Sequence, residues 1–600
     1  MPAIPTRQEV DPALTWNLAD LYPNEEAYAA ATAEYSRLAA DFAAKYQPWP
    51  TDAPAIASAL DDYATITVLA DRLGHYAFLP QAADGTDAAI NNRLNALSTL
   101  SATIDGELSF FTAALSTTPD ATLQEVANNH PEHAGFLRHI RAQKAAALDP
   151  AAEKVLATLA PELDAPASMR TQAIARDMDF GTFTAHGKEY PLSFVSYEET
   201  YQKHPDTEIR RAAYKQFNAT LAKYQNVIAT GYYNQVAKEK AIATMRGYDS
   251  VIDYLLADQE VTRDMFNRQI DVIMTDLAPV MRRYEKFVRK LWGLDHTGYT
   301  DLQIDIDPEY SPHFTIDEAK DLILNAVSVL GDDYRDLIAR NFTEAWTDYP
   351  ANIGKESGAF TSMAYGVHPY IMMSWAGNLP SVYTLVHELG HAGQMELSAK
   401  AQGPLNWMPS NYSVESPSTF HELLATEELL RTASDKRLRR FALSRLLNDT
   451  YFHNFVTHLL EAAFQREVYT LIDNGESFDA AKLNEIKRGV LTKFWGDAVQ
   501  LEPGAELTWM RQTHYYAGLY SYTYSAGLTI STQAFLKLRE DPKAGAQNWR
   551  NFLTLGDSVP PIEAARLAGV DITTDAPLRN TIKFLDDTER EIEALSAEID

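Results

Sequence analysis

The clearest pattern of hydrophobic and polar positions lies near the start of the chain. Large apolar side chains recur there at spacings of seven, three and four residues, at Tyr28, Tyr35, Leu38 and Phe42. Because an α-helix has about 3.6 residues per turn, this spacing places them on one face, and Asn24 is suited to cap the helix. We predict a helix over residues 24–46 that packs this face into a core.

Similar periodic segments follow through most of the chain, separated by Pro, Gly and Asp/Asn clusters. Thr315 and Glu318 have the spacing of a capping box, which would open a further helix. Alternating strands are few, so we predict a mainly α-helical fold. We find no repeat, low-complexity tract or flexible Gly/Ser linker, and any domains are therefore expected to be in close contact.

Two segments are exceptions to the helical pattern. Residues 180–184 and 190–194 alternate around His186-Gly187-Lys188, which predicts a β-hairpin. A second β region is predicted from Gly358 to Trp375. It could be an edge strand beside a cleft, where backbone groups pair with an extended ligand, or an ordinary buried strand.

Composition and charge exclude some classes of function. The chain has 600 residues, of which 46% are hydrophobic, and acidic residues outnumber basic ones by 82 to 52, giving a net charge of -30. Such a surface repels the phosphate backbone, so we expect no nucleic-acid partner. No signal peptide or membrane-spanning run is recognisable, and there is no cysteine. We expect a cytoplasmic protein without a membrane partner, whose metal ligands, if any, are His, Asp or Glu.

A candidate metal site lies at His387-Glu388-Leu389-Gly390-His391. On a helix, His387 and His391 are separated by about 40° and can reach one ion, while Glu388 beside them can take a proton from water. Chance alone would produce this pattern in roughly one in twenty chains of this composition and length. Gly390 costs the helix about 1 kcal/mol relative to alanine, which a closely approaching neighbour would explain.

The third metal ligand is expected to follow in a second helix. Glu415 is the preferred candidate, since 415 − 391 gives a spacing of 24 residues, and His421 is the competing one. Pro417 is tolerated only near a helix start, so Glu415 should lie close to that end. Glu422, seven residues after Glu415, could hydrogen-bond a ligand imidazole or could be a solvated helix charge.

Several motifs, in order, resemble the zinc metallopeptidases of family M3, the group of oligoendopeptidase F and thimet oligopeptidase. The segment Trp16–Tyr22 is similar to the oligoendopeptidase F opening, and residues 355–360 resemble its Lys-Arg-Ser-Gly-Ala-Tyr motif. The zinc motif within residues 384–392 and then Glu415 follow, so the resemblance covers nearly the whole chain. Ser416-Pro417-Ser418 is more similar to the thimet branch.

This resemblance implies a two-lobed helical bowl of the gluzincin type, with a deep central channel that admits short peptides and a small β region beside one Zn²⁺ ion. We expect an N-terminal helical lobe over residues 1–195 and a catalytic zinc peptidase domain over residues 196–600. The resemblance also assigns His514, together with Tyr522 or Tyr515, to hydrogen bonding of the tetrahedral intermediate. For at least three of the five tyrosines in this region, core packing is the simpler interpretation.

The leading functional prediction is a zinc endopeptidase for short oligopeptides, with Glu388 as general base and His387, His391 and Glu415 as ligands. A zinc carboxypeptidase could use the same centre if a cationic group captured the peptide terminus. A peptide-binding scaffold with a degenerate site is a third hypothesis. The sequence does not fix the side-chain specificity or the oligomeric state.

Overall fold

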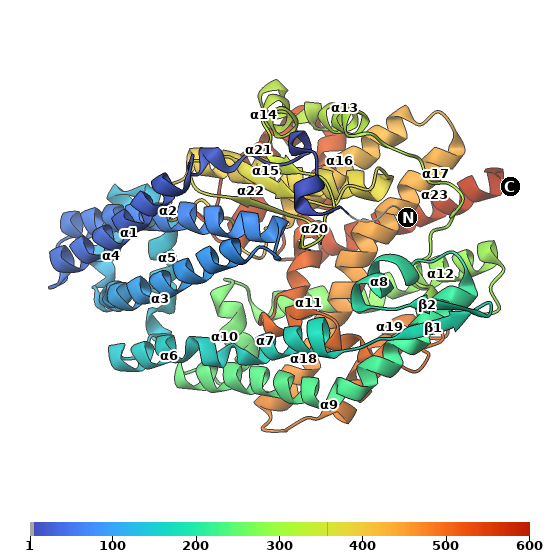
Figure 1. Cartoon of the computed structure of the whole chain (residues 1–600), viewed down its shortest axis with the longest axis horizontal. Helices are drawn as coiled ribbons and strands as arrows, with labels where there is room; N and C mark the ends of the chain where they lie inside the picture. Colours follow the sequence, from blue (N-terminus) through green and yellow to red (C-terminus); the bar gives the residue numbers. More distant parts are fainter. Residues whose placement is uncertain (1–4, 357, 600) are drawn as a thin grey trace. The chain divides into compact units, whose positions relative to one another are not determined.

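The structure, a computed structural model of the chain, describes residues 5–356 and 358–599. Helices dominate these ranges, and the named strands form two small sheets (Figure 1). The predicted mainly α-helical class is confirmed. None of the helices described combines the length and hydrophobicity that a membrane crossing requires.

The residues group into two compact units, each assembled from three separate stretches of chain. The first unit consists of Met1–Thr158, Pro312–Glu428 and Ala534–Val570, and the second consists of Leu159–Ser311, Leu429–Gln533 and Asp571–Asp600. This grouping does not follow the expected division at residue 195. The N-terminal stretch shares a unit with the candidate metal region, and its core extends to Ala364, Tyr370 and Met372, which precede the metal motif. The chain on both sides of residue 195 belongs to the second unit.

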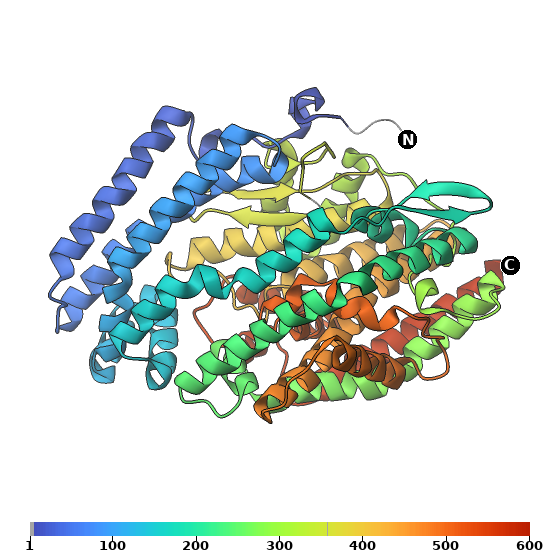
Figure 2. The same cartoon turned by 60° about the horizontal axis from the view of Figure 1, so that its bottom comes forward.

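The first unit opens with three long helices, α1 to α3, which lie side by side in both views (Figures 1 and 2). Its helices, some of whose ends extend beyond the unit, are α1 (Glu25–Tyr46), α2 (Ala53–Ala83), α3 (Ala88–Thr117), α4 (Asp120–Asn129), α5 (Ala134–Gln143), α6 (Pro150–Leu163), α13 (Ile316–Val327), α14 (Asp332–Thr343), α15 (Leu379–Ala401), α16 (Ser416–Thr432), α21 (Pro542–Leu553) and α22 (Pro561–Leu567).

The predicted N-terminal helix is confirmed as α1. The side chain of Asn24 accepts a hydrogen bond from the Ala27 amide at 2.9 Å, as an N-cap does. Tyr28, Tyr35 and Phe42 are buried along one face, and Leu38 packs against them at the edge of the core. The capping box predicted at Thr315 is also present, and it opens α13.

A three-stranded sheet in the first unit corresponds to the second predicted β region. Its strands are β3 (Thr347–Asp348), β4 (Phe360–Met363) and β5 (Pro369–Met372), in the order β3-β5-β4, with β5 antiparallel to β4. β4 is an edge strand and, like β5, it packs on α15 (Figure 2). Trp16, from the opening motif, packs edge-on against Tyr370 of β5 and thereby joins the N-terminal segment to the sheet.

A buried charge cluster fixes the residues around β3. The Asp348 carboxylate is completely buried, and the Lys355 ammonium donates to its Oδ1 at 2.7 Å. Arg7 donates to the same oxygen at 2.9 Å and forms an ion pair with Oδ2. Two cations therefore compensate one buried carboxylate, which would otherwise be costly to remove from water. Lys355 belongs to the second family motif; Ser357 of that motif lies outside the described residues.

The second unit is also helical and contains the longest helix of the chain, α9. Its elements are α7 (Ala165–Gln172), α8 (Phe194–Ser196), α9 (Thr207–Met245), α10 (Val251–Asp258), α11 (Arg263–Val272), α12 (Ala278–Trp292), α17 (Lys436–Arg445), α18 (His458–Asp473), α19 (Ala480–Trp495), the first part of α20 (Ser521–Glu540), α23 (Ala576–Ile599), the π-helix η11 (Leu446–Thr457), and the 3-10 helices η12 (Ala505–Met510) and η13 (Thr513–Tyr516).

The predicted hairpin is present in the second unit as β1 (Thr182–Ala185) and β2 (Lys188–Pro191), which pair antiparallel. Its turn is His186-Gly187, both with positive φ, a conformation that suits a two-residue hairpin turn. The second strand was predicted to continue to residue 194. It ends at Pro191 instead, because Ser193 caps the short helix α8 that begins at Phe194.

Candidate metal and peptidase site

The candidate metal motif lies on α15, in the first unit. Asn378 caps this helix by accepting a hydrogen bond from the Ser381 amide at 3.0 Å, and a proline occupies the first turn, where it is tolerated. The apolar residues before the motif are buried and hold the helix in the interior of the unit. His387 and His391 therefore lie one turn apart, with ring centroids separated by 5.0 Å.

Gly390 lies where α15 and α16 cross. A β-carbon on this residue would lie 2.6 Å from the Ser418 Cα and would collide with the Pro417 carbonyl oxygen. No side chain fits there without moving one of the two helices. The interpretation that a close neighbour accounts for this glycine is confirmed, and the contact brings the start of α16 against the metal motif.

Three donor atoms converge between the two helices. The Nε2 atoms of His387 and His391 each lie 3.3 Å from Oε2 of Glu415. For metal–ligand bonds of about 2.0–2.1 Å, two corners of a coordination tetrahedron are separated by about 3.3 Å. The spacing and the donor types thus fit a zinc ion. Glu415 immediately precedes α16, close to the helix start, as Pro417 predicted.

Further hydrogen bonds orient these donors. Glu422, on α16, lies 2.6 Å from Nδ1 of His387, so in the neutral ring the proton is held on that nitrogen and Nε2 has the lone pair. The Ser418 hydroxyl donates to the Glu415 carboxylate at 2.9 Å. Of the two interpretations considered for Glu422, the structure therefore places it in contact with the imidazole and not in solvent.

The same contacts determine the protonation of the cluster. Burial opposes a charge on His387, but hydrogen bonds to Glu415 and Glu422 outweigh it and hold the pKa of His387 well above its ordinary value. Burial likewise opposes the charge on Glu415, yet the neighbouring His391 and His387 hold its pKa well below the ordinary value. Glu415 is therefore ionised, and its protonation depends on that of His387 and His391.

Glu388 is buried and is oriented by a residue of the edge strand β4. The Thr361 hydroxyl oxygen lies 2.8 Å from Oε2 of Glu388 and 2.8 Å from its carbonyl oxygen. This single hydroxyl, which can donate to either oxygen, fixes the carboxylate relative to the helix backbone. Thr361 was not among the residues predicted from the sequence; its position one residue after the 355–360 motif is the signal that could have indicated it.

His421, the competing third ligand, lies outside the donor cluster. Its Nε2 is 2.8 Å from the Tyr334 hydroxyl on α14, and the ring is completely buried. Burial lowers the pKa of His421 to about 3, so the imidazole is neutral under ordinary conditions. In the structure, Glu415 occupies the position beside His387 and His391 that was considered for His421.

His514, Tyr515 and Tyr522 lie in the second unit, where their environments differ. The Tyr515 hydroxyl, in the interior, is 3.3 Å from Nζ of Lys487. The Tyr522 hydroxyl donates to Gln259 at 2.5 Å, and its ring packs edge-on against Phe266. Both phenols therefore make interior contacts, consistent with the core-packing interpretation.

The His514 ring, on η13, belongs to an aromatic and acidic cluster that the sequence argument missed. Its Nδ1 lies 3.6 Å from Oε2 of Glu461, and its Nε2 is 3.2 Å from the Tyr524 hydroxyl. Glu461 in turn accepts a hydrogen bond from Nδ1 of His458 at 2.8 Å. The signal available in the sequence was the pair His458 and Glu461, three residues apart on one helix face.

Comparison with known proteins identifies relatives along the whole chain. The family model described as peptidase family M3 matches residues 200–584. An "Oligopeptidase PepF" of Bacillus subtilis is 25% identical over 99% of this chain and 88% of its own length. An "Oligoendopeptidase F homolog" of Borreliella burgdorferi is 24% identical over 96% of this chain and 97% of its own length.

Solved structures share the fold. A putative peptidase from Chlamydophila abortus aligns with a TM-score of 0.85 and 22% identity, covering 99% of this chain and 100% of its own. An oligoendopeptidase-F from Enterococcus faecium aligns with a TM-score of 0.73 and 20% identity, covering 94% and 98%. At these identities the alignments establish a common fold.

Proposed function

This chain belongs to peptidase family M3 and is a metallopeptidase; from that premise, we propose that it is a zinc-dependent endopeptidase that hydrolyses short oligopeptides. The observation that carries the proposal is the convergence of three donor atoms, in which His387 Nε2 and His391 Nε2 each lie 3.3 Å from Glu415 Oε2, the separation of two tetrahedral ligands. The names of the relatives, oligopeptidase and oligoendopeptidase, support the substrate class.

In this proposal, His387, His391 and Glu415 hold one Zn²⁺ ion. When bound, zinc acts as a Lewis acid that activates water and polarises the scissile carbonyl. Glu422 keeps the Nδ1 proton of His387 in place, so that Nε2 is the donor. Ser418 restrains the carboxylate of Glu415 in the same way.

Glu388 is the proposed general base. Its carboxylate takes a proton from the attacking water and then delivers that proton to the nitrogen of the leaving amine. Thr361 holds Oε2 at 2.8 Å, which leaves the other carboxylate oxygen for proton transfer. The orientation of the base thus depends on a residue of strand β4 as well as on α15.

One further feature supports peptide binding. β4 is an edge strand, and an extended peptide could pair with its outer edge through backbone hydrogen bonds.

His514 remains the proposed donor to the tetrahedral intermediate, on the strength of the family resemblance. Tyr524 becomes the better tyrosine candidate, because its hydroxyl lies beside the His514 ring, whereas those of Tyr522 and Tyr515 lie beside Gln259 and Lys487.

The test combines metal analysis with product analysis. We expect one zinc per chain by mass spectrometry, activity on a mixed peptide pool that a chelator abolishes, and recovery on zinc addition. Glu388→Gln should retain zinc and lose turnover by several orders of magnitude; activity close to that of the wild type would contradict the general-base role.

The cleavage position separates endopeptidase from carboxypeptidase. A peptide blocked at its C-terminus should still be cut at an internal bond, whereas a carboxypeptidase would leave it intact. The expected cytoplasmic location belongs to the same proposal and can be checked by fractionating cells and measuring peptidase activity in each fraction.

A further inference from the structure

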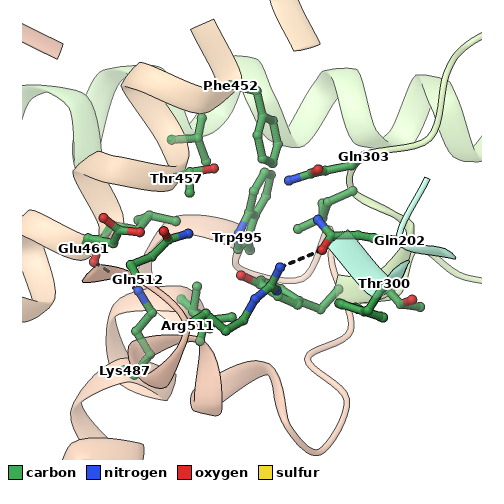
Figure 3. Close-up of a pocket in the computed structure, with 17 residues that line it drawn as sticks. Gln202, Thr300, Gln303, Phe452, Thr457, Glu461, Lys487, Trp495, Arg511 and Gln512 are labelled. Atoms are coloured by element: carbon green, nitrogen blue, oxygen red, sulfur yellow. Dashed lines mark hydrogen bonds between the residues drawn. The ribbon is translucent and has the colours of Figure 1, made fainter. Parts of the chain in front are cut away.

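The second unit contains a cavity of about 90 Å³ that is lined by both charged and apolar side chains (Figure 3). Two cationic side chains, Lys487 and Arg511, line it together with the polar side chains of Glu461 and Gln512. Much of the remaining lining is apolar or aromatic and includes Phe452, Val456, Leu460, Leu491 and Trp495. A cavity of this size has room for several water molecules or a small ion.

Lys487 is a buried cation with poor hydrogen bonding. The residue, on α19, is 3% exposed, and its Nζ lies 3.5 Å from the Leu460 carbonyl oxygen and 3.3 Å from the Tyr515 hydroxyl. Hydrogen bonds from an ammonium group are usually about 2.7–2.9 Å long. No carboxylate of the described residues lies within 4.0 Å of this nitrogen. Lysine is rarely buried so completely without an ionic partner.

Arg511 adds a second positive group to the same wall. Its Nε and Nη2 donate to Glu198 at 3.1 and 2.9 Å, and Nη2 also donates to Gln202 at 2.7 Å (Figure 3). Among the described residues, no side chain or carbonyl accepts a hydrogen bond from Nη1. The guanidinium therefore retains donor capacity beyond its ion pair with Glu198.

The carboxylate in the wall is already compensated elsewhere. Oε2 of Glu461 accepts hydrogen bonds from Nδ1 of His458 at 2.8 Å and from the Ser521 hydroxyl at 3.1 Å, and His514 lies next to it. Burial would raise the pKa of Glu461, but the two histidines hold it far below its ordinary value. The hydrogen bonds of Glu461 are thus directed to the imidazoles and Ser521, and Lys487 interacts with this carboxylate only at longer range, without a hydrogen bond.

We propose that this cavity binds a small monovalent anion, a carboxylate or a halide, with Lys487 and Arg511 as its cationic partners. The anion would provide the short, charged hydrogen bonds that Lys487 does not make with protein groups. Burial lowers the pKa of Lys487 to about 8, and a bound anion would favour its charged form at neutral pH. This inference does not depend on the proposed peptidase mechanism.

Thermal unfolding of the zinc-loaded protein tests the proposal. Sodium chloride or sodium acetate is compared with sodium gluconate, whose anion is much larger, at constant ionic strength. A ligand that binds the folded state raises the unfolding temperature and saturates. We expect such a rise of a few degrees in chloride or acetate for the wild type, and no anion-specific rise for Lys487→Met.

Lys482→Met is the matched control, because Lys482 lies on the same helix but is partly exposed and paired with Glu485 at 3.1 Å. It should respond to anions like the wild type. Equal responses of the wild type and Lys487→Met, or no response of the wild type, would overturn the proposal. The second result would mean that Lys487 is buried as a neutral amine.

Bromide provides a measurement that does not require the variant to fold. Crystals of the wild type soaked in bromide should give an anomalous peak in the cavity, in contact with Lys487 or Arg511. A cavity without a peak would overturn the proposal. Adding acetate separates the two sources: loss of the peak identifies a site that also takes carboxylates, whereas a persistent peak identifies a halide site.

Discussion

At the scale of single residues, the orientation of the proposed general base depends on one hydroxyl group. Thr361→Val keeps the shape of the side chain but removes the hydrogen bond to Glu388. A hydrogen bond to a charged group contributes about 1.5–3 kcal/mol, so we expect kcat to fall roughly 10- to 100-fold with little change in KM. Steady-state kinetics on a fluorogenic peptide measures both.

Thr361→Ser is the control for this variant, because it restores the hydroxyl and should restore most of kcat. Zinc content should remain at one per chain in both variants. If valine and serine reduced kcat equally, the role of Thr361 would be packing of β4 and not orientation of the carboxylate.

The buried imidazole of His421 should make the stability of the first unit depend on pH. Its pKa of about 3 in the folded protein lies below the ordinary value of 6.5, because burial disfavours the charged form. Its contribution to stability is therefore complete above pH 6.5 and is lost as the pH falls towards 3, at about 1 kcal/mol per pH unit.

His421→Gln can still accept the hydrogen bond from Tyr334 but does not titrate in this range. Urea unfolding between pH 7 and 4.5 should show a shallower loss of stability for this variant than for the wild type. The same pH slope in both proteins would contradict the assignment of a neutral, buried His421.

Some of these residues could be predicted from the sequence because they lie close together along the chain. His387, Glu388 and His391 lie within one turn of helix, so their relative positions follow from helix geometry alone. Thr361 and Glu422 are brought to the motif by tertiary contacts across 27 and 35 residues. No periodicity indicates which strand residue will face a helix, so only the position of Thr361 directly after the 355–360 motif could have indicated it.

The hydroxyls of Tyr515 and Tyr522 illustrate the same limit. Each tyrosine was selected by its place in an aromatic run, but its partner comes from another helix, Lys487 on α19 and Gln259 immediately after α10. The spacing of the tyrosines within the run indicates which of their rings point in different directions. It does not predict which hydroxyl finds a buried partner.

At the scale of elements, the crossing of α15 and α16 is the contact that forms the centre. Gly390→Ala should improve helix propensity by about 1 kcal/mol, but it would force the β-carbon against Pro417 and Ser418. Overpacking of this kind typically costs about 1–3 kcal/mol. We therefore expect a net loss of stability together with weaker zinc binding, measured by urea unfolding and by chelator competition.

Gly106→Ala is the matched control in the same unit. Gly106 lies within α3, and a β-carbon there would meet no atom within 4 Å. Alanine should stabilise the protein at this position and leave zinc affinity unchanged. If both alanine variants were stabilising, the close approach at Gly390 would not be the reason for its glycine.

Helix boundaries were easier to predict than strand boundaries. Asn24 and Thr315 cap helices as their side-chain chemistry predicted, because an N-cap is a contact between residues close in sequence. The hairpin was correctly placed, but the end of β2 was not. Alternation continued past Pro191, whereas the competing cap at Ser193 ended the strand.

At the scale of the whole molecule, the grouping of the chain into units could not be predicted. Each unit is assembled from three stretches, and in both units the first two are separated by more than 100 residues. The expected boundary at residue 195 was based on a local feature, the hairpin, but such a feature carries no information on which distant stretches share a core.

The net charge of -30 has a kinetic consequence at the same scale. A strongly negative surface attracts cationic peptides, and salt screens that attraction over about 10 Å at 0.1 M. We expect kcat/KM for lysine-rich peptides to fall as sodium chloride increases, and kcat/KM for acidic peptides of equal length to rise. Parallel salt dependence for both peptides would show that surface charge does not govern encounter.

The ion pair between Arg7 and Asp348 has a practical consequence for shortened forms of the protein. A chain trimmed to begin at Trp16 would retain every motif from the opening segment to Glu415, and by sequence it would look intact. It would nevertheless lack one of the two cations that compensate the buried Asp348. Lys355 would still pair with Asp348, but the hydrogen bonds from Arg7 to this charged group would be lost, and such bonds contribute about 1.5–3 kcal/mol. Residues outside the family motifs therefore contribute to the stability of the fold, and proteolytic removal of the segment that holds Arg7 would destabilise the protein without touching its metal centre.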